Sequence, residues 1–129
     1  MIHLDTSVLV DALTGPRRSL PRIREAIERG ERIGLSALAL YEWLRGPRVE
    51  PELADQEALF PRQESVPFGV LEAALAADLY REVSRPRGRE IDLAVAACAI
   101  LHGASLWTLN PRDFRDIPDL RLFEPPTGP

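Results

Sequence analysis

Residues 1–13 read MIHLDTSVLVDAL, a short apolar run that stops at an acid and resumes as a mixed, mostly apolar segment. The apolar run, residues 1–4, predicts a buried strand that ends at Asp5. Asp5, Thr6 and Ser7 carry side chains that favour the start of a helix, and apolar residues follow them at once. The opening of the chain therefore indicates a strand that leads directly into a helix.

The same alternation of strand and helix recurs along the chain. Further strands are expected at residues 32–36, 64–68, 105–109 and 121–123. Further helices are expected between Ser19 and Gly30, with Leu20, Ile23, Ala26 and Ile27 on the buried face, and at residues 37–45, 52–60, 70–84 and 90–102. Alternating strands and helices with short links predict a mostly parallel sheet covered by helices on both faces, an α/β fold. The length of 129 residues predicts one domain, residues 1–129, with a frayed proline-rich tail at residues 125–129.

Composition excludes several classes of function. All 16 basic residues are arginine, and without lysine the chain can form neither a Walker-A phosphate loop nor a Schiff base. The net charge of −4 argues against a protein that coats nucleic acid through bulk positive charge. A single cysteine, Cys98, with two histidines, excludes four-cysteine and two-cysteine, two-histidine zinc sites and favours a reducing, cytoplasmic location. We expect no signal peptide and no membrane-spanning segment.

Four acids lie where open parallel sheets carry their sites, just after a strand or in the helix that follows one. They are Asp5, Glu42, Asp92 and Asp113. Taken singly, each has an ordinary structural explanation: Asp5 as a helix cap, Glu42 as a solvated side chain, Asp92 as a partner of the helix dipole, and Asp113 as a turn cap. Together at one sheet edge, however, four carboxylates repel one another unless a cation is bound.

Carboxylate oxygens select Mg²⁺ or Mn²⁺, which can also accept phosphate oxygens of a substrate. The chemistry that this pattern predicts is hydrolysis of a phosphodiester by water activated at the metal. Four hydroxyl and amide side chains could orient the carboxylates or waters, although each could equally be a cap or turn residue: Thr6, Ser7, Thr108 and Asn110.

At this point the residues match a known family over nearly the whole chain. The sequence resembles the PIN-domain ribonucleases, specifically the VapC-like toxins of toxin–antitoxin pairs. The resemblance rests on Asp5-Thr6-Ser7 with Leu9-Val10-Asp11, on Glu42 within residues 36–46, on Ile91-Asp92-Leu93 leading into Ala96-Ala97-Cys98-Ala99, and on Thr108-Leu109-Asn110 with Asp113-Phe114.

The resemblance implies an α/β/α sandwich in which the four acids form the catalytic pocket. Asp5 and Asp92 are then the expected ligands of Mg²⁺, with Mn²⁺ able to substitute, while Glu42 and Asp113 complete metal binding or position the water. It also implies an RNA substrate, a homodimer, and a cognate antitoxin that covers the pocket, often with a basic side chain.

Three arginines just upstream of Asp92 could hold the RNA backbone, or could form a solvated loop: Arg85, Arg87 and Arg89. Two other functions stay open on the sequence alone. One is a PIN nuclease that acts on DNA or in RNA processing unrelated to toxicity. The other is a binding module without catalysis, in which the acids dock a basic peptide.

Overall fold

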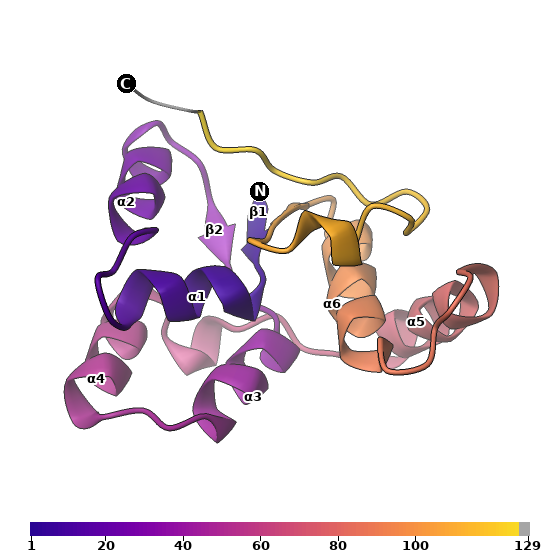
Figure 1. The fold of residues 1–129 in the computed structure, drawn as a ribbon, viewed down its shortest axis with the longest axis horizontal. Coiled ribbons are helices and arrows are strands. Elements are labelled where there is room, and N and C mark those ends of the chain that lie inside the picture. Colours follow the sequence, from indigo (N-terminus) through magenta and orange to yellow (C-terminus); the bar gives the residue numbers. More distant parts are fainter. Residues whose placement is uncertain (127–129) are drawn as a thin grey trace.

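The computed structural model describes residues 1–126, and there it shows three parallel strands interleaved with six α-helices (Figure 1). The strands are β1 (Ile2–Leu4), β2 (Ile33–Gly34) and β3 (Ser105–Trp107), in the spatial order β2-β1-β3. Ile2 lies between Ile33 and Ser105 in the register of the two pairings. Because all strands are parallel, their carboxyl ends meet at one edge, and Asp5 follows the central strand there.

The helices are α1 (Thr6–Leu13), α2 (Leu20–Glu28), α3 (Ala37–Arg45), α4 (Glu50–Leu59), α5 (Val70–Glu82) and α6 (Glu90–Leu101). In Figure 1, α1 to α4 lie on one side of β1 and α5 and α6 on the other. The α/β fold with a parallel sheet, predicted from the alternation, and the α/β/α sandwich implied by the resemblance are therefore confirmed. No helix within residues 1–126 has both the length and the apolar character needed to cross a bilayer.

Successive residues of the central strand point to opposite faces of the sheet, as the geometry of a strand requires. Ile2 and Leu4 are buried in the core formed with α1, α2 and α3, whereas the ring of His3 lies 5.8 Å from that of His102 at the end of α6. On β3, Trp107 joins the first core and Leu106 the second, which contains most of α6. The sheet thus separates two apolar cores, and α6 is buried nearly all round, as its sequence predicts.

The predicted strand at residues 64–68 is wrong in extent. Only Val66 pairs, in an isolated bridge with Ser36. The chain before it turns as a 3-10 helix, η1 (Arg62–Glu64), and Pro67 after it has no N–H with which to extend a ladder.

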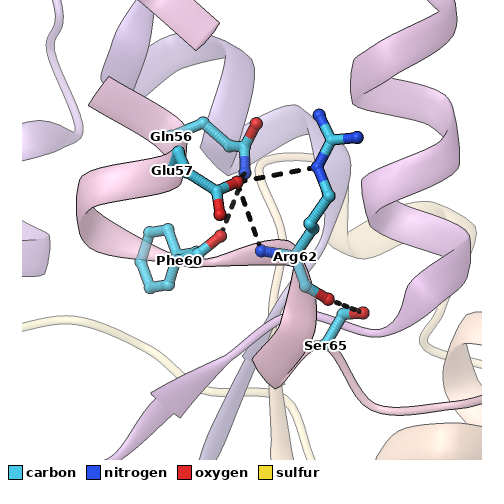
Figure 2. Close-up of polar contacts among 5 residues, drawn as sticks. All are labelled: Gln56, Glu57, Phe60, Arg62 and Ser65. Carbon is cyan, nitrogen blue, oxygen red and sulfur yellow. Dashed lines mark hydrogen bonds and ion pairs between the residues drawn. The ribbon is translucent and has the colours of Figure 1, made fainter. Parts of the chain in front are cut away.

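Side-chain hydrogen bonds hold that turn in place (Figure 2). The fully buried Gln56 donates to the carbonyl of Phe60 (3.0 Å), and the hydroxyl of Ser65 donates to the carbonyl of Arg62 (2.7 Å). The carboxylate of Glu57 accepts from the backbone N–H of Arg62 (3.3 Å). These contacts fix the chain in a turn at the point where hydrophobicity alone suggests a strand.

Two other expectations need correction. Residues 121–123 form no strand but a single bridge between Leu122 and Leu106, and the prolines that begin at Pro125 prevent its extension. Ile27, placed on the buried face of its helix, is 45% exposed, because the contacts of α2 end with Ala26. Of the predicted frayed tail, Pro126 accepts a hydrogen bond from Arg22 (2.9 Å), and residues 127–129 lie outside the described part of the chain.

Candidate active site

Asp5 occupies the N-cap position of α1, yet its side chain makes no capping hydrogen bond. Its carboxylate is turned instead toward β3, where Oδ2 accepts hydrogen bonds from the hydroxyls of Ser7 and Thr108, each at 2.8 Å. The residue is only 6% exposed. A buried carboxylate that does not cap its helix needs another source of stabilisation, so the simple capping explanation for Asp5 does not hold.

The two hydroxyls have their protons directed to Asp5 by the backbone of the following turn. The N–H of Leu109 donates to Oγ of Ser7, and the N–H of Asn110 donates to Oγ1 of Thr108, both at 3.0 Å. Each hydroxyl therefore uses its oxygen as an acceptor and its proton for the carboxylate. This arrangement holds one oxygen of Asp5 in place. For Asn110 the contact uses the backbone and not the side-chain amide that the sequence suggested.

Glu42 projects from α3, which begins where the Ser36 hydroxyl accepts a hydrogen bond from the N–H of Ala39 (3.1 Å). Oε1 of Glu42 accepts a hydrogen bond from the hydroxyl of Thr6 (2.9 Å), and Oε2 lies 3.5 Å from the guanidinium of Arg45. Only 21% of the side chain is exposed. Glu42 is thus tied to the start of α1, directly after Asp5, and is not a freely solvated side chain.

Asp92 stands in the first turn of α6, whose next seven residues are all buried. Burial, together with the negative charges of Asp5, Asp113 and Glu42, raises the pKa of Asp92 to about 6, against a smaller opposing effect of Arg89. All three other predicted acids therefore lie close enough to act on Asp92. The structure brings the four acids into one electrostatic neighbourhood at the carboxyl edge of the sheet.

Asp113 lies at the end of the short 3-10 helix η2 (Pro111–Asp113) and is exposed. The next residue, Phe114, is buried in the core under α6 and anchors the turn. Beside Asp113 is a surface hollow of about 280 Å³, lined by Leu109, Asn110, Pro111, Arg112, Asp113 and Arg115. Of the four acids, Asp113 alone lines this hollow.

The donor set fits a divalent cation in kind and charge, since it consists of carboxylates that repel one another. Within residues 1–126, however, no group of three or more His, Cys, Asp or Glu side chains is placed so that all of them could hold one metal ion. An open site of this kind suits Mg²⁺ or Mn²⁺, which take one or two carboxylates and keep several waters.

The three upstream arginines differ in their surroundings. Arg85 and Arg87 are exposed in the loop before α6. Arg89 is instead held by Asp116 and by the backbone carbonyl of Asp113, and only 20% of its side chain is exposed. Arg89 is thus bound within the protein, whereas Arg85 and Arg87 are exposed.

Comparison with known proteins agrees with this geometry. Residues 2–120 match the family described as PIN domain. The chain belongs to the PIN-domain family. It is 35% identical to Ribonuclease VapC19 of Mycobacterium tuberculosis over 123 residues, which cover 92% of this chain and 95% of that protein. The family resemblance seen in the sequence is therefore confirmed.

Solved structures share the fold of this PIN domain. A DNA-bound VapBC complex from Salmonella typhimurium aligns with a TM-score of 0.79 at 25% identity, covering 95% of this chain and 96% of that one. A toxin–antitoxin complex from Klebsiella pneumoniae aligns with a TM-score of 0.67, also at 25% identity, covering 93% and 95% of the two chains.

Two residues of the PIN domain's acidic site were missed in the sequence. Arg45 could have been found, because it follows Glu42 by three positions on a predicted helix, a spacing at which charges meet. Asp116 could not, because its partner Arg89 is separated from it by 27 residues and by the whole of α6.

Proposed function

We propose that this PIN domain is a divalent-metal-dependent endoribonuclease of the VapC type, the toxin of a toxin–antitoxin pair. The observation that carries the proposal is the placement of Asp5, Glu42 and Asp92 at the carboxyl edge of the sheet, and the raised pKa of Asp92, which burial and the charges of the other three acids cause together, supports it. Four carboxylates gathered in this way are costly without a cation. The family relation supplies the ribonuclease activity, and the acids supply a site for it.

Asp5 and Asp92 are the proposed ligands of Mg²⁺, since Asp5 is buried and the pKa of Asp92 is raised by burial and by the other acids. When bound, the ion activates a water and stabilises charge on the phosphate during in-line displacement. Ser7 and Thr108 hold the Asp5 carboxylate by the oxygen Oδ2, which leaves Oδ1 for the ion.

Glu42 and Asp113 complete the site in different ways. Thr6 and Arg45 restrain both oxygens of Glu42, so this acid orients neighbouring water rather than moving with substrate. Asp113 is exposed beside the hollow and meets the reacting water at the solvent side. Because the chain has no lysine, arginine, backbone N–H groups or the metal must hold the RNA phosphates, and the exposed Arg85 and Arg87 are the proposed contacts.

A cognate antitoxin is the proposed protein partner. The structural relatives include toxin–antitoxin complexes, and the net charge of −4 with an acidic site suits a partner that inserts a basic side chain. Homodimerisation stays a prediction, which sedimentation equilibrium of the purified chain checks.

The test is cleavage of labelled single-stranded RNA and DNA by purified, antitoxin-free protein with Mg²⁺, Mn²⁺ or EDTA. Asp92→Asn is compared with Asp119→Asn, a matched loss of one exposed carboxylate outside the site. RNA cleavage that needs metal and is lost only in Asp92→Asn supports the proposal. Preference for DNA would indicate a PIN nuclease with another substrate. A folded protein that cleaves neither substrate and takes up no Mn²⁺ would favour a binding module without catalysis.

A further inference from the structure

Arg89 and Asp116 form a two-point ion pair at the edge of the acidic site. The guanidinium donates to both carboxylate oxygens of Asp116, from Nη2 to Oδ1 at 2.6 Å and from Nη1 to Oδ2 at 2.9 Å. The same Nη2 also donates to the backbone carbonyl of Asp113 at 2.9 Å. This fork geometry is specific to arginine and is more directional than an ordinary surface pair.

The pair joins the two elements that carry Asp92 and Asp113. Arg89 is the N-cap residue of α6, and its carbonyl accepts the N–H of Leu93 (2.9 Å), so its backbone is fixed to the turn that bears Asp92. Its side chain reaches the turn that bears Asp113. One arginine therefore connects two acids whose positions in the sequence are far apart.

The turn around Asp113 is otherwise anchored at its start, where the N–H groups of Leu109 and Asn110 bond to Ser7 and Thr108, and from beneath. Phe114 and Ile117 are buried in the core, at 2% and 4% exposure, and fix the apolar side of the turn. On the polar side, the Asp113 N–H bonds to the carbonyl of Asn110 within the same turn (3.0 Å). Among the described residues, the contact from Arg89 is thus the hydrogen bond that ties the Asp113 backbone to α6.

We propose that Arg89 and Asp116 are positioning residues for the nuclease reaction. They hold Asp113 at a fixed position relative to Asp92 in the acidic site. This inference rests on the proposed function, since it assigns a role within the same site. Asp116 fixes the arginine, and the arginine fixes the carbonyl of Asp113. Engaged in this way, the Arg89 guanidinium serves the protein's own geometry and does not bind RNA phosphate.

The experiment compares Arg89→Lys and Asp116→Asn with the wild type. Arg89→Lys keeps the charge and loses the fork, and Asp116→Asn keeps the size and loses the charge. The matched controls are Arg24→Lys and Asp119→Asn, which change exposed residues outside the site. Asp116 is on the surface and Phe114 and Ile117 anchor the turn from the core, so all four variants should fold, as circular dichroism would show.

Each of the two test variants should lower kcat by about tenfold or more and weaken Mn²⁺ binding in calorimetry by about the same factor, while KM for RNA changes little. The double variant should lose no more kcat than the more impaired of the two single variants, because both changes break the same ion pair. Asp116→Glu, which keeps the carboxylate, should recover part of kcat.

A second readout does not depend on catalysis. The N–H groups of Phe114 and Arg115 donate to the carbonyl of Pro111, both at 3.1 Å, and report on the turn. Their hydrogen exchange should be faster in Asp116→Asn and Arg89→Lys than in the controls.

The other outcomes would overturn the inference. A rise in KM with unchanged kcat would make Arg89 an RNA contact, and variants equal to an active wild type would leave the pair without a role. Unchanged exchange at Phe114 and Arg115 would also contradict it. A wild type that neither cleaves RNA nor binds Mn²⁺ would instead refute the proposed function, and the inference would fall with it. Should Asp116→Asn fail to fold, Arg89→Lys decides the question alone.

Discussion

The hydroxyl of Thr108 donates a hydrogen bond to Oδ2 of Asp5 across 2.8 Å, although 103 residues separate the two. Thr108 directly follows β3, and Asp5 directly follows β1, which is its parallel neighbour. The N–H of Asp5 also donates to the carbonyl of Trp107 (2.8 Å), so backbone and side chain together join the ends of the two strands. Parallel pairing is therefore what places a hydroxyl from the end of the chain on an acid at its start.

This contact makes Thr108 a test of how the Asp5 carboxylate is oriented. Thr108→Val keeps the shape and removes the hydroxyl, leaving Oδ2 with Ser7 alone. We expect kcat to fall by about 10- to 100-fold, as when a partner of a metal-binding side chain is lost. Thr108→Ser, which keeps the hydroxyl, is the matched control and should stay within a few-fold of the wild type in an RNA-cleavage assay. Equal loss in both variants would point to packing and not to the hydrogen bond.

Asp92→Asn should abolish cleavage and yet stabilise the metal-free fold at neutral pH. The pKa of Asp92 is raised to about 6 from an ordinary value near 3.8, so the folded protein holds this proton more tightly than the unfolded chain does. Ionisation between those two values therefore costs stability, on the order of 1 to 3 kcal/mol by about pH 7. Urea unfolding in EDTA should give Asp92→Asn a higher free energy of unfolding than the wild type at neutral pH, and the same value near pH 4. A destabilised Asp92→Asn variant would contradict this account of the site.

Metal binding should offset the repulsion between the Asp92 carboxylate and the other three acids. We expect Mn²⁺ to raise the unfolding free energy of the wild type, by about 2.7 kcal/mol at a free concentration 100 times Kd. The gain should shrink below pH 6, where Asp92 takes up a proton that competes with the ion. Thermal unfolding with and without Mn²⁺ measures this gain in stability. Asp92→Asn should show a much smaller gain, while Asp119→Asn should match the wild type.

The fold was largely predictable because its strongest signals are local. The serine cap at Ser36 and the stop at Gly46 predict α3 at its observed bounds, Ala37–Arg45. The unbroken apolar run after Asp92 predicts that α6 is buried, which it is. The local sequence does not show why the strand expected at residues 64–68 fails to form. The turn at residues 62–65 depends on Gln56 and Glu57, which reach it from the preceding helix.

The acidic site was predictable in its members and not in its internal contacts. Acids that follow parallel strands share one edge, so the grouping of Asp5 after β1 with Asp113 after β3 follows from chain order. Asp92 begins α6, which comes directly after α5, so its place in the group depends on how α6 packs. The hydrogen bond from Thr6 to Glu42 and the ion pair of Arg89 with Asp116 depend on how helices pack. Neither spacing nor composition encodes such contacts, which is why the sequence leaves Arg89 open between an RNA contact and a solvated loop and does not reveal its ion pair with Asp116.

His3 offers a prediction of opposite sign to that for Asp92. The residue is 1% exposed, and neither ring nitrogen has a hydrogen-bond partner within the described residues. Burial, with smaller contributions from His102 and the N-terminal amine, lowers its pKa to about 4. The unfolded chain therefore binds this proton more tightly than the folded protein, and stability falls as the pH drops from about 6.5 toward 4, by on the order of 3 kcal/mol at most.

Because the two groups titrate over one pH range in opposite directions, they should nearly cancel in the metal-free wild type between about pH 4.5 and 6.5. Unfolding free energies from urea titrations in EDTA should then change little with pH. His3→Leu removes the histidine contribution, and its stability should fall as the pH rises through this range. Asp92→Asn removes the carboxylate contribution, and its stability should rise instead. The double variant should be flat again, since it lacks both groups. Parallel pH profiles for the two single variants would show that these groups do not set the acid response.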